Sequence, residues 1–217
     1  MTVLPPAPDR LDQASLLQGV EILTELDADL ARVVNAYGPP PLWAREPSFA
    51  TLIHIILEQQ VSLASANAAF ARLLDIARLP GVDQPLTPER FVTLDDETLR
   101  GVGFSRQKQG YGRHLAQCIL SGDLDLAVLP ALTDDEVRQE LLQVKGIGAW
   151  TADIYLMEAL LRPDIWPVGD LALAVAAQQV KGLSERPTPD ELLALAEPWR
   201  PWRSVTARIL WHNYLSQ

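Results

Sequence analysis

The chain has 217 residues, of which 48% are hydrophobic, and it carries a formal net charge of −10 at pH 7. This length and composition predict one large or two small folded domains and argue against intrinsic disorder. The single cysteine, Cys118, excludes an internal disulfide and a four-cysteine metal or iron–sulfur site. We find no apolar run of the roughly 18 residues needed to span a bilayer, and no basic region of a signal peptide at the N-terminus, so we expect a soluble cytoplasmic protein.

Apolar residues at helical spacing predict two helices within residues 11–37, meeting near residues 25–29. Gly38 and the three prolines after it end the second helix and form a plausible domain boundary. Ser48 is the expected N-cap of an apolar helix that ends near Glu58. A further helix is expected from about Leu63 to Leu74, and residues 80–88 are expected to form a loop.

Basic residues gather in two segments that contain no acidic residue. The first runs from Arg100 to Gly122 and includes Ser105, the expected N-cap of a helix; the second follows Glu197. The acidic total disfavours DNA binding, but screening over about 8 to 10 Å allows local basic faces to act while remote carboxylates are muted. The alternative is that both segments are ordinary solvated helix faces.

The most informative stretch lies between residues 133 and 170. Thr133 and Glu136 form a capping box that predicts a helix start, and Gly146-Ile147-Gly148 predicts a tight reversal before a second helix over residues 149–161. A helix N-terminus without a shielding side chain binds phosphate through its backbone N–H groups. The alternative is an ordinary turn between two helices. Asp170 opens the next helix, an apolar run to Val180.

Several strings in this order resemble the helix-hairpin-helix (HhH-GPD) DNA glycosylases. The first is Val-Lys-Gly-Ile-Gly-Ala-Trp-Thr-Ala at residues 144–152, and Pro-Val-Gly-Asp at 167–170 follows it. Further matches are Gln-Gln-Val-Ser at 59–62, Gly-Phe-Ser-Arg-Gln-Lys at 103–108 and Pro-Trp-Arg-Ser at 201–204. The resemblance covers about residues 49–214 and is greatest to the 3-methyladenine DNA glycosylase II branch.

This resemblance implies an all-α fold of two helical lobes, with DNA bound across the groove. One lobe is expected from both chain ends, residues 1–45 and 162–217, and the helical bundle that contains the hairpin from residues 46–161. Some members carry an additional N-terminal β domain, which we do not expect in this chain. The implied partner is double-stranded DNA that contains damaged bases, bound by a monomer associated with the nucleoid.

The resemblance makes Asp170 the catalytic carboxylate, although an Asp at this position is also a common helix N-cap. A fixed carboxylate stabilises the positive charge that develops on the sugar as the glycosidic bond breaks. Bifunctional members carry a Schiff-base lysine where this chain has Trp150, so a monofunctional hydrolase is expected. Aromatic faces bind an alkylated, cationic base; Trp150, Trp202 and Tyr155 are the pocket candidates, with core packing as the alternative for each Trp. Some relatives have an aromatic residue at Ile154, so the pocket shape is open.

DNA contacts are implied at the hairpin and at the starts of two other helices: Gly146, Ile147, Gly148, Lys145, Thr151, Ser105, Arg106, Lys108, Gln59, Gln60, Ser62 and Arg203. Gln60 occupies the position at which family members insert a wedge into the duplex, and an exposed turn residue is the alternative. No cofactor is expected, although hairpin carbonyls hold a monovalent cation in relatives. Two other functions remain open, a non-catalytic DNA-binding module and a purely structural helical protein.

Overall fold

The computed structural model describes residues 4–78 and 86–217, and the chain forms two compact units. Unit 1 comprises residues 1–44 and 156–217, and unit 2 comprises residues 45–155. The all-α prediction is confirmed, because the described residues contain helices and no strand. Within these two ranges, no helix is both long and apolar enough to cross a membrane. Of the loop expected at residues 80–88, residues 80–85 lie outside the described residues.

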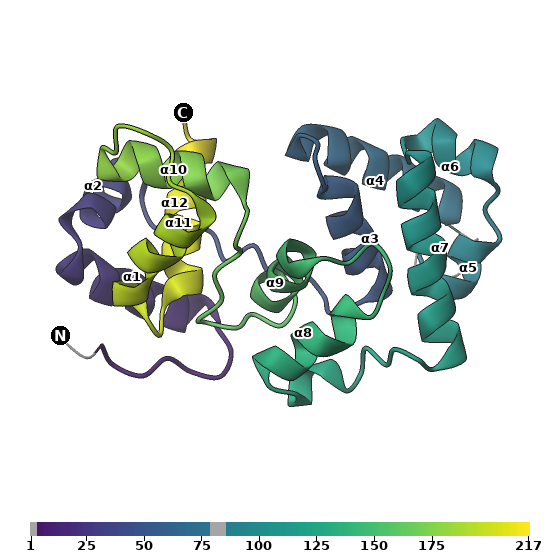
Figure 1. The fold of residues 1–217 in the computed structure, drawn as a ribbon, viewed down its shortest axis with the longest axis horizontal. Coiled ribbons are helices and arrows are strands. Elements are labelled where there is room, and N and C mark those ends of the chain that lie inside the picture. The colour runs from purple at the N-terminus through teal and green to yellow at the C-terminus, as the bar shows by residue number, and fades with distance from the viewer. Residues whose placement is uncertain (1–3, 79–85) are drawn as a thin grey trace. The chain divides into compact units, whose positions relative to one another are not determined.

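Unit 1 is assembled from both ends of the chain (Figure 1). Its helices are α1 (Gln13–Leu26), α2 (Ala28–Tyr37), α10 (Leu171–Lys181), α11 (Pro189–Ala196) and α12 (Arg203–Leu215), with a 3-10 turn at Glu197–Trp199. The two helices expected within residues 11–37 are therefore confirmed, and Asp27 caps α2 where they meet. A backbone bond from Leu11 N to Leu161 O (2.8 Å) joins the N-terminal segment to the segment that follows α9.

The centre of unit 1 is α12, which packs on α1, α2 and α10. Most of its side chains are buried on every side, including those of Arg203 and Arg208. Trp202, just before α12, fits against Gly19 of α1, where an added Cβ would lie 2.6 Å from the indole ring. Gly19 is therefore required by close packing, since a methyl group there would overlap the ring.

Unit 2 contains the remaining helices, which Figure 1 shows from α3 to α9. They are α3 (Phe49–Glu58), α4 (Leu63–Ala77), α5 (Pro88–Val92), α6 (Asp96–Val102), α7 (Arg106–Ser121), α8 (Asp134–Leu142) and α9 (Ala149–Glu158). The predicted N-caps Ser48 and Ser105 are confirmed, because each hydroxyl accepts a hydrogen bond from the backbone N–H three residues later. The core forms where α3 and α5 pack against α7. Gly112 of α7 lets the ring of Phe91 approach to 2.6 Å from the position of a Cβ.

The chain passes from unit 2 back to unit 1 inside α9, between Tyr155 and Leu156. The sequence placed this boundary later, at residues 161/162, which lies within unit 1. Met157, before the predicted boundary, already belongs to unit 1. Its side chain is fully buried, and its carbonyl accepts a hydrogen bond from Arg208 of α12 (2.6 Å). Residues 154–157, on both sides of the crossing, are Ile, Tyr, Leu and Met and are all buried, so no polar position marks the crossing in the sequence.

Candidate functional site

The hairpin between α8 and α9 forms as the sequence predicts. The capping box at the start of α8 is confirmed: Thr133 N donates to the Glu136 carboxylate (2.8 Å), and Glu136 N donates to the Thr133 hydroxyl (3.4 Å). The chain then turns, with Ile147 N bonded to Val144 O (3.0 Å), and α9 begins at Ala149.

Gly146 is required by the fold of the hairpin. Its φ of +96° lies in the region that side chains avoid, and an added Cβ would lie 2.1 Å from Cγ of Tyr111 on α7. The hairpin therefore rests directly on the aromatic ring of α7.

Gly148 differs from Gly146, because the free protein has no steric need for glycine there. It is exposed, its φ is not left-handed, and an added Cβ would meet no atom within 4 Å among the described residues. The first N–H groups of a helix have no intrahelical acceptor. Because Gly148 has no side chain, the N-terminus of α9 is left uncovered, which is a favourable place for an anion.

Two distant side chains hold the hairpin in place. The backbone N–H of Lys145 donates to Nδ1 of His114 on α7 (3.1 Å), so the His114 ring must carry its proton on Nε2. Across the hairpin, Arg138 of α8 donates to the carboxylate of Asp153 on α9 (2.7 Å). The side chain of Lys145 is exposed, and that of Ile147 is buried, so Ile147 is available to a ligand only through its backbone.

The hairpin carbonyls are already used within the protein. Those of Val144 and Gly148 accept backbone hydrogen bonds, and that of Gly146 accepts one from Nε2 of Gln59 (2.9 Å). No group of three or more His, Cys, Asp or Glu side chains suited to a metal occurs in the described residues.

Three residues expected to contact DNA, Gln59, Thr151 and Lys108, make hydrogen bonds within the protein. Gln59 donates from Nε2 to both Gly146 O (2.9 Å) and the hydroxyl of Thr151 (3.0 Å), and Thr151 is buried. Nζ of Lys108 donates to the carbonyls of Leu57 (2.7 Å) and Gln59 (2.8 Å). No sequence pattern marked these links, because their partners lie 49 to 92 residues away.

The remaining predicted DNA contacts in unit 2 lie at the surface. Ser62 and Ser105 cap α4 and α7, and both are exposed. Arg106, the first residue of α7, is exposed, as is Gln60 in the turn between α3 and α4.

Asp170 in unit 1 is the N-cap of α10, and its carboxylate is held by two donors. Oδ1 accepts from the backbone N–H of Leu173 (2.7 Å) and from the indole Nε1–H of Trp211 (3.2 Å). The residue is 9% exposed. The cap predicted from the sequence is thus confirmed, and the second donor fixes the carboxylate orientation beyond what a cap requires.

The aromatic pocket candidates differ in burial. Trp150 is half-buried. Trp202 is fully buried in the core of unit 1, where its indole donates to Pro5 O (3.0 Å), so its alternative, core packing, describes it best. Tyr155 is fully buried too, its hydroxyl has no hydrogen-bond partner among the described residues, and burial raises its pKa above the ordinary value.

Trp211 was not singled out from the sequence, although it is the aromatic residue that touches Asp170. It lies within α12, and no motif in the sequence around it marks it as a site residue. The spacing of 41 residues from Asp170 becomes meaningful only once α12 packs on α10.

In the second basic segment, Arg200, Arg203 and Arg208 are paired with acidic residues or buried. Arg203 is 8% exposed, and its guanidinium donates to the Asp164 carboxylate (2.7 Å from Nε). Arg200 pairs with Asp164 and Glu197. Arg208 is fully buried and donates to the carbonyls of Leu42, Ser204 and Met157; burial lowers its pKa to about 10. The acids that neutralise this segment precede it in the chain, so a count of charges after Glu197 missed them.

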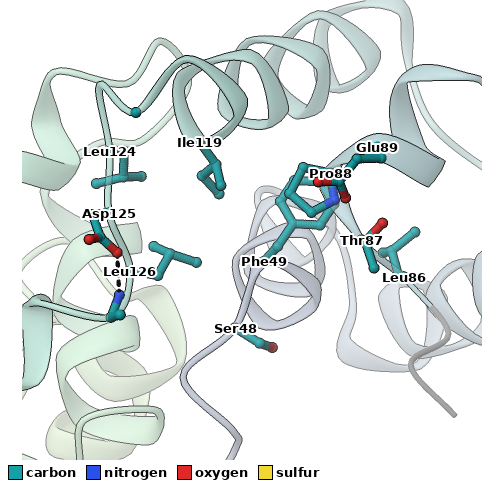
Figure 2. A pocket seen from close by; sticks show the side chains of 12 residues that line it. Ser48, Phe49, Leu86, Thr87, Pro88, Glu89, Ile119, Leu124, Asp125 and Leu126 are labelled. Atoms are coloured by element: carbon teal, nitrogen blue, oxygen red, sulfur yellow. Dashed lines mark hydrogen bonds between the residues drawn. The ribbon is translucent and has the colours of Figure 1, made fainter.

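Unit 2 also has a pocket of about 610 Å³, lined by the starts of α3 and α5, the end of α7 and the segment that follows it (Figure 2). Phe49, Ile119 and Leu126 form apolar parts of its wall. Among the described residues that line it, none is a predicted site residue. No residue of the hairpin is among the residues that line the pocket.

The chain is similar to a known protein family and to known proteins of other organisms. The family described as "HhH-GPD superfamily base excision DNA repair protein" matches residues 53–201. The chain is 30% identical over 183 residues to DNA-3-methyladenine glycosylase 1 of Schizosaccharomyces pombe, which covers 84% of this chain and 79% of that protein. It is 28% identical over 186 residues to YfjP of Bacillus subtilis, covering 85% of this chain and 65% of YfjP.

Among solved structures, the chain resembles the S. pombe 3-methyladenine DNA glycosylase Mag1 in complex with abasic DNA. The TM-score is 0.81 at 30% sequence identity, and the match covers 89% of this chain and 95% of that one.

Proposed function

The chain belongs to the HhH-GPD superfamily of base excision DNA repair proteins, and we propose that it is a monofunctional glycosylase that removes alkylated bases of the 3-methyladenine type from double-stranded DNA. Relatives that carry this activity in their names support the proposal. The observation that carries it is the Asp170 carboxylate, which is nearly buried and held by two N–H donors.

Asp170 is the catalytic carboxylate of this proposal. As the bond between the sugar C1′ and the base nitrogen breaks, its electron pair leaves with the base, and positive charge grows on the sugar. A carboxylate whose direction is already set stabilises that charge without reorganising during the reaction. The same oxygens orient the water that attacks C1′ and accept its proton.

Trp211 is a positioning residue for Asp170. Its indole N–H donates to Oδ1, the oxygen that also caps α10, so rotation of the carboxylate away from this direction would break both bonds.

The hairpin supplies binding to the DNA backbone. Gly148 leaves the N-terminus of α9 uncovered, and the exposed side chains of Lys145 and Arg106 add positive charge in the same unit. Phosphate contacts of this kind position the duplex and carry no information about the lesion. Half-buried Trp150 is the pocket candidate that remains accessible to an extruded base in this unit.

The reaction ends at the abasic site. Trp150 occupies the position at which bifunctional relatives carry an amine nucleophile, and an indole cannot form an imine with the sugar aldehyde. The expected products are therefore the free base and an unbroken strand.

Incubation of the protein with methylated duplex DNA tests the proposal directly. Released 3-methyladenine should be detected by chromatography, the abasic product should remain unnicked, and borohydride should trap no protein–DNA adduct. Tight duplex binding without released base would instead support the alternative, a non-catalytic DNA-binding module. A borohydride adduct would refute monofunctional hydrolysis.

A further inference from the structure

The turn between α3 and α4 has an unusual backbone. Gln59 has φ −57° and ψ 121°, Gln60 has φ +58°, and Val61 N points back to Glu58 O at 3.5 Å. These angles describe a type II turn, whose third residue is normally glycine because a side chain is strained at positive φ. Strain of this kind persists only where the surroundings enforce it, and it concentrates at functional sites.

The side chains that this turn presents are exposed. Gln60 is exposed, and two apolar residues beside it, Val61 and Leu63, are 46% and 48% exposed. An apolar surface held in a strained turn is suited to a partner that offers flat apolar faces, and stacked bases offer such faces.

Lys108 holds the peptide that defines this turn type. The carbonyl of Gln59 belongs to the central peptide, and its direction distinguishes a type II turn from a type I turn. Nζ of Lys108 donates to that carbonyl (2.8 Å) and to Leu57 O (2.7 Å), a carbonyl in the last turn of α3 that lacks an intrahelical donor. Within residues 4–78 and 86–217, no carboxylate pairs with Lys108, and burial lowers the pKa of its ammonium group.

The same turn is joined to the phosphate-binding hairpin. The Gln59 side chain donates to Gly146 O (2.9 Å) and to the Thr151 hydroxyl (3.0 Å). Tyr111 lies one helical turn after Lys108 on α7, and its ring packs against Gly146. One face of α7 therefore contacts both segments: Tyr111 packs against the hairpin, and Lys108 bonds to the turn.

We propose that Lys108 is a positioning residue for base extrusion. Its ammonium group holds the turn at residues 58–61 in the strained form and at a fixed position relative to the hairpin. Gln60 and its apolar neighbours then enter the duplex next to the place where the hairpin binds the DNA backbone. This inference rests on the proposed glycosylase function. It replaces the phosphate contact that the sequence suggested for Lys108, because both short contacts of the ammonium are to protein carbonyls.

Lys108→Met removes the ammonium group and keeps an unbranched side chain that is one atom shorter. We expect its salt dependence of duplex binding to match that of the wild type, because no phosphate contact is lost. Single-turnover excision at saturating protein should fall by roughly tenfold or more, since a misplaced turn presents the base poorly. Fluorescence of 2-aminopurine placed beside an abasic analogue should show reduced extrusion.

A double-mutant cycle separates positioning from general damage. If Lys108 acts through the turn, Lys108→Met should cost little further extrusion or excision in a Gln60→Ala background. Arg106→Met, on the same helix and exposed, serves as the reference for a lost phosphate contact, with a salt slope lower by about one. If Lys108→Met has a much lower melting temperature than the wild type, the milder variant Lys108→Gln replaces it.

The outcomes are distinct. A salt slope that falls by about one in both Lys108 variants, or unchanged extrusion and excision with an unchanged slope, would overturn the positioning role. Additive losses in the cycle would overturn it too. If the wild type releases no base, the proposed function fails, while the 2-aminopurine signal and the salt slope still report on the turn.

Discussion

At the scale of single residues, Asp170 combines two roles in one carboxylate oxygen. The bond from Leu173 N is local, three residues along the chain, and satisfies the start of α10. The bond from Trp211 comes from 41 residues away and is not needed for a cap. The cap explains why an Asp is stable here, and the second donor prepares the carboxylate for chemistry.

Asp170→Asn tests the carboxylate charge without removing the cap. The amide oxygen can accept both hydrogen bonds, so the melting temperature and the affinity for abasic duplex should change little. Excision should fall by about 10²-fold or more, because a neutral amide cannot offset charge on the sugar. Single-turnover excision measures this, and a variant as fast as the wild type would remove Asp170 from the catalytic role.

Trp211→Phe tests the positioning bond, since it keeps an aromatic ring and removes the indole N–H. Excision at saturating protein should fall by roughly tenfold, the value of one hydrogen bond to a charged group. In an Asp170→Asn background the same change should have little further effect. Equal losses in both backgrounds would show that the ring acts independently of Asp170.

At the scale of elements, the hairpin contains two glycines that are present for different reasons. Gly146 has a left-handed φ and lies against Tyr111, whereas Gly148 meets no atom at its Cβ position among the described residues. The first glycine serves the fold, and the second leaves room for a ligand at the start of α9.

A matched pair of substitutions separates these reasons. Gly146→Ala should lower the free energy of unfolding by about 1–3 kcal/mol, because the methyl group is strained and overlaps the ring. Gly148→Ala should leave urea unfolding nearly unchanged and weaken duplex binding, measured by fluorescence anisotropy. Unchanged duplex affinity in Gly148→Ala would mean that phosphate does not approach this corner.

At the scale of the whole molecule, the net charge of −10 must be reconciled with DNA binding, and the two units do so differently. In unit 1, the arginines after Glu197 are paired with Asp164 and Glu197 or are buried. In unit 2, Arg106 and Lys145 are exposed. Positive charge available to phosphate is therefore expected on unit 2.

Salt dependence checks this division. Arg106→Ala and Lys145→Ala should each reduce the slope of log affinity against log salt by about one. Arg203→Ala should leave the slope unchanged, because its guanidinium serves Asp164. It should lower stability instead, by about 1.5–3 kcal/mol, because the charged hydrogen bonds of Arg203 to Asp164 are lost while Arg200 still pairs with that carboxylate. A slope lowered by Arg203→Ala would return this residue to the DNA-binding set.

The sequence by itself determined the helical class, most helix starts and the hairpin. The reason is that caps and turns are local: Ser48, Ser105, Thr133 and Asp170 each bond to a backbone N–H three residues later, so four residues contain all the information. The order of these local motifs was also sufficient to identify the family. Helix ends were predicted less well than helix starts: α4 continues to Ala77 where the sequence analysis ended it at Leu74, and α9 ends at Glu158 where the sequence analysis continued it to residue 161.

The tertiary structure decided what each charged or aromatic side chain does. Lys108 reaches Gln59 across 49 residues, Arg203 reaches Asp164 across 39, and Trp211 reaches Asp170 across 41. A basic residue in the sequence has the same appearance whether its partner is a phosphate, a carbonyl or a carboxylate. Burial and the direction of the side chain distinguish these partners, and both arise only when helices distant in the chain pack together.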